Sequence, residues 1–126
     1  MKKAINTNKA PLPVGPYNQA VLVDKTLYIS GQVALNPANN ELIQGSIDEE
    51  SHQIMKNIES ILKEVGLDFK NIVRSKIYLT DMNNFSKVNK VYGSYFEKGH
   101  EPARTTIEVS GLPLGVDVEI DMIAVV

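Results

Sequence analysis

The sequence predicts an α+β fold in which two helices cover one face of a mixed β-sheet. The prediction depends on three observations: one long amphipathic helical pattern, two adjacent apolar segments typical of a hairpin, and a last segment with alternating apolar residues. In chain order, we expect the pattern β-β-β-α-β-α-β-β. Two helices among this many strands are most simply placed as one layer on a single sheet face.

The composition is that of an ordinary globular protein, with 126 residues, 43% apolar and 22% charged. This length suits a single domain, residues 1–126, whose core needs no metal or disulfide. The chain has no cysteine, which removes thiolate chemistry and cysteine metal sites. We expect a cytoplasmic protein, because the N-terminus lacks an apolar signal segment and no stretch approaches the ~18 apolar residues of a membrane helix.

The first third of the chain is expected to contain the first strands. Residues 3–7 can form a short strand. Residues 8–17 contain three prolines and a glycine, which predict an ordered loop because proline restricts both itself and the residue before it. The apolar run over residues 19–35 then predicts two strands joined by a turn at Asp24 and Lys25.

Residues 46–65 give the clearest helical pattern. Ser46 and Glu49 predict a capping box at its start, and Gly66 supplies a stop. Six apolar residues share one stripe at helical spacing: Ile47, Ile54, Ile58, Ile61, Leu62 and Val65.

A strand and a second helix are expected next. Residues 71–81 are rich in β-branched side chains and predict the strand. Asp81 then caps a helix over residues 83–98, which Gly99 ends. Its apolar side consists of Phe85, Val88, Tyr92, Tyr95 and Phe96.

Two final strands are expected near residues 104–110 and 116–126. In the last one, alternation places one set of residues on the core face: Val116, Val118, Ile120, Met122, Ala124 and Val126. The opposite face bears Asp117, Glu119, Asp121, Ile123 and Val125. Because this open face is half apolar, we expect an oligomer built on it. Alternation in the preceding strand predicts Arg104 on the same open face as Glu119, especially if the two strands form a hairpin.

Several function classes find little support. The net charge is −2, with 13 basic residues scattered along the chain, so nucleic acid is not an expected partner. His52 and His100 have no neighbouring ligand cluster, so no metal site is predicted. There is no GxSxG motif and no phosphate-binding glycine loop.

Five segments, taken together and in order, resemble the reactive intermediate deaminase family, also called RidA or YjgF-like, which are enamine/imine deaminases. They are "GPYNQA" at 15–20, "LYISGQVALNP" at 27–37, "VN" with "YFE" in the second helix, "PARTTIEVSGLP" at 102–113 and "VEIDMIAV" at 118–125. The resemblance implies a chorismate-mutase-like fold and a homotrimer with a central barrel and clefts between subunits. It implies no metal, flavin or pyridoxal phosphate.

The resemblance also implies catalytic residues. Arg104 matches the carboxylate-binding arginine, Glu119 the water-positioning glutamate and Tyr17 the site tyrosine. The implied reaction hydrolyses 2-imino acids, such as those derived from 2-aminoacrylate, to 2-oxo acids and ammonia. Each residue also has an ordinary structural interpretation: a surface ion pair for Arg104, a solvated strand position for Glu119 and loop packing for Tyr17.

Four further residues match substrate-binding positions of the family. Ser30 and Gly31 match its serine–glycine pair, and Asn89 matches its helix asparagine. Thr106 stands where the family often has cysteine, and we expect its backbone N–H to make the contact. In the structural interpretation, Ser30 satisfies a backbone group and Gly31 permits close backbone approach.

Two other classes of function stay open at this point. One is a non-catalytic trimer that binds small 2-oxo acids, for which Arg104 would serve equally well. The other is a chaperone-like protein, translation inhibitor or ribonuclease, as members of the family have been described. The acidic charge and the lack of a histidine pair speak against RNA cleavage.

Overall fold

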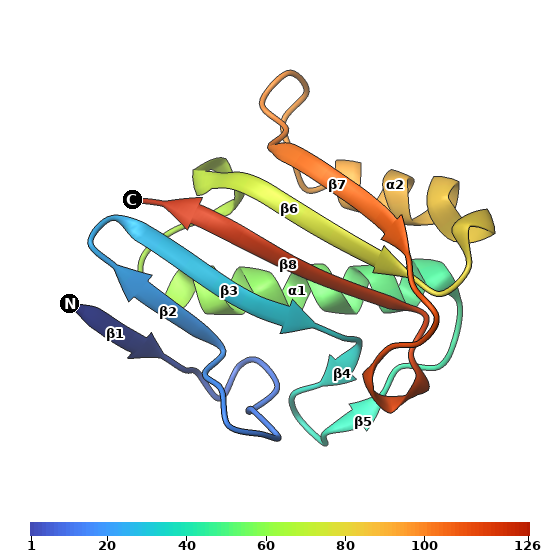
Figure 1. Ribbon diagram of the computed structural model, residues 1–126, viewed down its shortest axis with the longest axis horizontal. Helices are drawn as coiled ribbons and strands as arrows, with labels where there is room; N and C mark the ends of the chain where they lie inside the picture. The colour runs from blue at the N-terminus through green and yellow to red at the C-terminus, as the bar shows by residue number, and fades with distance from the viewer.

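Six strands form one mixed sheet in the order β1-β2-β3-β8-β6-β7 (Figure 1). The computed structural model describes all residues, 1–126. The strands are β1 (Lys2–Ile5), β2 (Ala20–Val23), β3 (Thr26–Gln32), β6 (Ile72–Leu79), β7 (Ala103–Glu108) and β8 (Val118–Val125). A small separate pair, β4 (Leu35–Asn36) and β5 (Glu41–Leu42), lies within the loop before the first helix.

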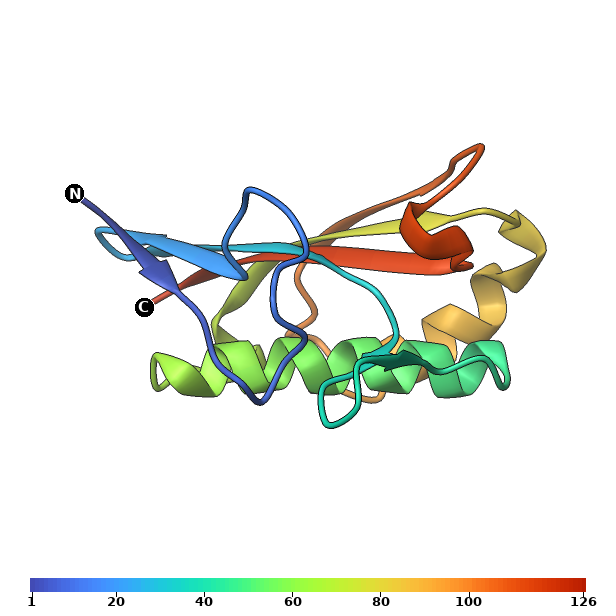
Figure 2. The same cartoon turned by 90° about the horizontal axis from the view of Figure 1, so that it is seen from below.

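Both helices, α1 (Ile47–Glu64) and α2 (Phe85–Gly93), lie on the same face of the sheet (Figure 2). The core fills the space between these layers, and the expected two-layer α+β arrangement is confirmed. From α1 the core takes Ile54, Met55, Ile58, Ile61 and Leu62, and from β8 it takes Val118, Ile120, Met122 and Ala124. Neither helix has the combination of length and apolarity that spanning a membrane requires.

The start and end of α1 follow the local signals. The Ser46 side chain accepts a hydrogen bond from the Glu49 N–H at 3.1 Å, and Gly66 has a φ of 72° just beyond the helix. Only this half of the predicted capping box forms. The Glu49 carboxylate lies instead against Gly45, where an added Cβ would be 2.6 Å from it.

The second helix is shorter than predicted. Asp81 caps a 3-10 turn, η2 (Met82–Asn84), by accepting from the Asn83 N–H at 2.9 Å, and α2 then ends at Gly93. Glycine and serine at residues 93–94 weaken the helix here. The two aromatic residues that follow leave the helix and pack on Phe69, with ring centroids 5.4 and 5.5 Å apart.

The two final strands do not form a hairpin. β7 pairs only with β6, in parallel, whereas β8 runs antiparallel between β3 and β6. Arg104 is in register with the buried Ser75, and Glu119 with Tyr78 on the opposite face. The prediction that Arg104 shares the open face with Glu119 is therefore wrong, because the register of β7 is set by β6 and not by β8.

The alternation of β8 is confirmed over the strand itself. Val118 to Ala124 are buried at every second position, and Glu119, Asp121 and Ile123 lie on the face without helices. Val126, predicted on the core face, lies beyond the strand and is exposed. The open face also carries the exposed Tyr28 of β3, so it is partly apolar.

A buried glutamate on α1 meets an exposed aspartate in the segment before β8. Glu50, in the first turns of α1, is only 6% exposed, and it lines a cavity of about 230 Å³ together with Asp117. Burial raises the pKa of Glu50 to about 7, and a hydrogen bond and the negative charge of Asp117 add to the shift. Folding therefore favours the protonated form of this carboxyl.

We expect Glu50→Gln to stabilise the protein at alkaline pH. Because the pKa of Glu50 is raised in the folded state, its contribution is fully present below pH ~4.5 and is lost as pH rises through about 7. Glutamine keeps a donor for Asp117 without ionising. The unfolding temperature should rise by several degrees at pH 8, reflecting about 1–2 kcal/mol, and stay nearly unchanged at pH 4.5.

The matched control is Glu64→Gln at the exposed end of α1. This change should shift the unfolding temperature by the same small amount at pH 4.5 and at pH 8. An equal effect of Glu50→Gln at both pH values would show that Glu50 does not take up a proton on folding.

Candidate functional site

Glu119 lies on the open face of β8, directly over the backbone of β3. A Cβ added to Gly31 would be 2.5 Å from Glu119 Oε2 and 2.7 Å from its Cδ. The β3–β8 register also shifts between Ile29 and Gln32, which gives β3 an extra residue at this point. The bulge and the missing side chain together make the space that the carboxylate occupies.

The environment of Glu119 makes its carboxylate a stronger base. Burial raises its pKa above the ordinary value, and the negative charge of Asp121 on the same face adds to the effect. No cation pairs with it, since the one ion pair in the structure joins Lys63 and Glu59. A half-buried carboxylate of this kind can hold a water molecule and accept its proton.

Tyr17 shares a cavity of about 130 Å³ with Gly31 and Glu119, here called the Glu119 cavity. Tyr17 comes from the proline-rich loop between β1 and β2, and its side chain is 48% exposed. The walls are mostly apolar: Leu12, Val14, Leu35, Pro113 and Leu114. The structure therefore brings together three of the predicted residues, from a loop, a bulge and a strand.

Ser30 lies beside this cavity but uses its side chain for the fold. Its hydroxyl donates to the Asn18 carbonyl at 2.7 Å, and its N–H donates to the Gln19 carbonyl at 2.9 Å. Both bonds tie β3 to the loop that carries Tyr17. The structural interpretation of Ser30 is therefore the one that these contacts support.

Arg104 lies at the free edge of the sheet, against α2. Its guanidinium carbon is 5.1 Å from the centroid of the Tyr92 ring and 5.6 Å from that of Phe85. No carboxylate lies within the 4.0 Å of an ion pair. Two cation–π contacts hold the side chain while its N–H donors stay available, as a clamp for a carboxylate requires.

Thr106 follows Arg104 on the same strand and face. The Val109 N–H donates to the Leu79 carbonyl at 2.8 Å, so alternate amides of β7 point to β6. By this period of two, the N–H of Thr106 points away from the sheet at its free edge. The hydroxyl of Thr106 is buried and has no hydrogen-bond partner.

Asn89 belongs to the same neighbourhood as Arg104. It lies four residues after Phe85 and three before Tyr92, so it shares their face of α2. It is half-buried, between the exposed and the core positions of the helix.

The predicted residues therefore form two groups on one chain. The Glu119 group consists of Tyr17, Ser30, Gly31 and Glu119, and the Arg104 group consists of Asn89, Arg104 and Thr106. The two lie on opposite faces of the sheet, so a single chain does not bring them together. A small ligand cannot contact both groups within one copy of this fold.

Sequence reasoning missed two features of these groups. Phe85 and Tyr92, predicted on the apolar side of the helix, also hold Arg104; Tyr92 is in the core as expected, whereas Phe85 is 36% exposed. Their spacing of seven residues indicates that they share one face of the helix, but it does not distinguish aromatic residues that pack in the core from aromatic residues that hold an arginine. Gln19 entered the sequence analysis only as part of the segment "GPYNQA". In the structure it is the most buried polar residue of the loop, at 1% exposure.

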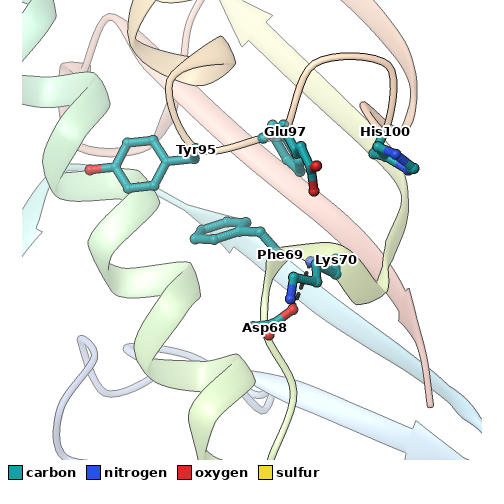
Figure 3. Close-up of a pocket in the computed structure, with 7 residues that line it drawn as sticks. Asp68, Phe69, Lys70, Tyr95, Glu97 and His100 are labelled. Atoms are coloured by element: carbon teal, nitrogen blue, oxygen red, sulfur yellow. Dashed lines mark hydrogen bonds between the residues drawn. The ribbon is translucent and has the colours of Figure 1, made fainter.

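A separate pocket of about 250 Å³ lies between the end of α2 and η1 (Phe69–Asn71), shown in Figure 3. It contains none of the predicted site residues. Its lining is Asp68, Phe69, Lys70, Tyr95, Phe96, Glu97 and His100. The Asp68 carboxylate accepts from the Lys70 N–H at 2.8 Å and thus serves to cap η1.

Comparisons with known sequences match nearly the whole chain. The family model described as Endoribonuclease L-PSP matches residues 7–126. The chain is 50% identical over 125 residues to the 2-iminobutanoate/2-iminopropanoate deaminase of Mus musculus, covering 99% of this chain and 92% of that protein.

Solved structures of Rid-family proteins have the same fold as this chain. A protein of the conserved Rid family from Yersinia pestis matches with a TM-score of 0.97 and 42% identity, over 100% of both chains. RidA from an Antarctic Psychrobacter matches with a TM-score of 0.94 and 36% identity, over 98% of this chain and 99% of that one. The α+β fold implied by the sequence resemblance is thus confirmed for the single subunit.

We expect Gly31→Ala to destabilise the protein through the Glu119 carboxylate. The added methyl group would overlap Oε2 and displace the carboxylate, which costs about 1 kcal/mol, at the low end of overpacking, because the end of a flexible side chain can move aside. In the Glu119→Ala background the same change should cost much less, because the overlapping atoms are gone. Urea unfolding of the two single variants and the double variant measures this coupling.

Gly93→Ala is the matched control, because an added Cβ there meets nothing within 4 Å. Equal costs of Gly31→Ala with and without the Glu119 side chain would contradict the close approach.

Proposed function

This chain belongs to the endoribonuclease L-PSP family, which includes the RidA and YjgF-like proteins, and we propose that it is a 2-iminobutanoate/2-iminopropanoate deaminase. The observation that carries the proposal is its identity, over nearly the full length, to the mouse protein of that name. The two groups of site residues supply the chemistry that such a reaction needs.

The proposed reaction hydrolyses a carbon–nitrogen double bond. An enamine such as 2-aminoacrylate tautomerises to the 2-imino acid, and water adds to the imine carbon. The resulting aminoalcohol loses ammonia and leaves the 2-oxo acid. Because this sequence already proceeds in water, a catalyst needs mainly to orient the substrate and supply a positioned water molecule.

Arg104 is proposed to bind the substrate carboxylate through its guanidinium fork. The outward N–H of Thr106 adds a donor to the same ligand, and Asn89 lies beside it. These groups fix the imine carbon relative to the water. The absence of a carboxylate partner within the chain supports this role, because it leaves the N–H donors of Arg104 free for a ligand.

Glu119 is proposed to hold the attacking water and to accept its proton as the C–O bond forms. This proton passes to the nitrogen and gives the aminoalcohol. Glu119 then takes the hydroxyl proton and passes it to the same nitrogen, so that the C=O bond forms as the C–N bond breaks and ammonia leaves. The raised pKa of Glu119 supports both transfers, because it brings the basicity of the carboxylate closer to neutral pH. Tyr17 closes the cavity and hydrogen-bonds the substrate or the water, beside the Gly31 backbone.

We further propose that the protein is a homotrimer with the site between subunits. The Arg104 group of one subunit would face the Glu119 group of its neighbour. Three observations support this: the two groups lie on opposite faces of one chain, the open face is partly apolar, and β7 has a free edge. The homotrimer is also what the sequence resemblance implies.

The word endoribonuclease in the family description raises RNA cleavage as an alternative. Such an activity needs a surface that attracts phosphates and a pair of groups for acid–base transfer. This chain has a net charge of −2, and its two histidines lie apart, one on α1 beside Tyr95 and one in the loop before β7. The imine deaminase assignment is therefore the better supported of the two.

Arg104→Ala is expected to lower kcat/KM for 2-imino acids by ~100-fold, because the variant loses a pair of charge-assisted hydrogen bonds to the substrate carboxylate. The unfolding temperature should fall by only a few degrees, because the change removes two cation–π contacts and no ion pair. In the assay, an amino acid oxidase generates imino acids in the presence of semicarbazide, and hydrolysis reduces the semicarbazone signal. Hydrolysis at the parent rate by the variant would remove Arg104 from the site.

A mixture of two impaired variants tests the shared cleft. Arg104→Ala and Glu119→Gln should each have little activity alone, but subunits refolded together should regain a fraction of the parent activity. In the mixed assembly, an intact Arg104 of one subunit can meet an intact Glu119 of another. Absence of recovery, with mixed oligomers shown by mass spectrometry, would contradict a site shared between Arg104 of one subunit and Glu119 of another.

A further inference from the structure

The loop between β1 and β2, residues 6–19, has no regular secondary structure and little buried apolar surface. Leu12, Val14 and Tyr17 are 60%, 72% and 48% exposed, and Ala10 is its one buried apolar residue. Hydrophobic burial therefore does little to hold the loop in one conformation. Yet this loop presents Tyr17 to the Glu119 cavity.

A single buried side chain makes most of the polar contacts that close the loop. Gln19 Oε1 accepts from the Thr7 N–H at 2.7 Å. Its Nε2 lies 2.7 Å from the Pro11 carbonyl, 3.0 Å from that of Thr7 and 3.2 Å from that of Ala10. An amide alone fits this arrangement, since one end must accept and the other must donate.

The main chain of Gln19 forms hydrogen bonds with the residue that follows β1 and with β3. Its N–H donates to Asn6 Oδ1 at 3.0 Å, and its carbonyl accepts from the Ser30 N–H at 2.9 Å. Ser30 precedes Gly31, whose backbone lies under the Glu119 carboxylate. Gln19 thus connects the loop of Tyr17 to the strand that shapes the space around Glu119.

We propose that Gln19 is a positioning residue, whose buried amide fixes the β1–β2 loop so that Tyr17 faces Glu119. Gln19 also lines the Glu119 cavity, but it acts through Tyr17 and not on the substrate, because its polar atoms are all engaged by the loop and by Ser30 of β3. This inference rests on the proposed function, in which Tyr17 closes the cavity over the substrate.

The primary test is Gln19→Met, which keeps the side-chain length and removes every hydrogen bond of the side chain. We expect kcat/KM for 2-imino acids to fall ~10-fold, mainly through kcat, because Arg104 still binds the carboxylate. In the Tyr17→Ala background, the same change should cause almost no further loss. A purely structural role would lower activity by a similar factor in both backgrounds.

Gln53→Met is the matched control. Gln53 lies on α1 and donates to Asn57 Oδ1 at 2.9 Å, away from both groups of site residues. This variant should keep the parent kinetics. If Gln19→Met fails to fold, Gln19→Asn keeps an uncharged amide that is one methylene too short to reach all of these partners, and it permits the same comparison.

Hydrogen exchange on the intact protein gives a readout that does not depend on activity. Amides of residues 8–18 should exchange faster in Gln19→Met, while those of β3, β6 and β8 keep their protection. Parent kinetics in Gln19→Met, or equal losses with and without Tyr17, would overturn the proposal. If the parent protein hydrolyses no imino acid, the proposed function fails, and exchange alone decides whether Gln19 holds the loop.

Discussion

The parallel pairing of β7 with β6 determines how the rest of the site has to be assembled. Two parallel strands in sequence need a crossover on one face of the sheet, and α2 provides it. The crossover places α2 beside β7, so that Arg104 lies against Phe85 and Tyr92. Glu119, one strand beyond β6, then points to the opposite face, and a complete site requires a second subunit in the function we propose.

Local signals allowed a large part of the fold to be predicted from the sequence. Ser46 and Gly66 bound α1 because capping depends on neighbouring residues, and the turn at Asp24 forms with a φ of 52° between β2 and β3. The alternation of β8 identified its two faces, because a strand that covers a core must repeat every second residue. Each of these signals spans only a few residues.

The rest depends on contacts between distant segments. Alternation shows that Arg104 and Thr106 share a face, but only the partner strand decides which face it is. The need for glycine at residue 31 likewise comes from the Glu119 carboxylate, 88 residues later in the chain. The early end of α2 follows from the packing of Tyr95 and Phe96 on Phe69, which helical periodicity cannot anticipate.

The separation of Arg104 and Glu119 across the sheet also preserves their chemistry. If they faced each other within one chain, a salt bridge would lower the pKa of the carboxyl and occupy the guanidinium. Instead, burial and Asp121 raise the pKa of Glu119, and aromatic rings hold Arg104 without neutralising it. In the proposed trimer, the substrate carboxylate provides the missing countercharge for Arg104. The imine carbon is then held where Glu119 can still act as a base, because the charge of the arginine is already compensated.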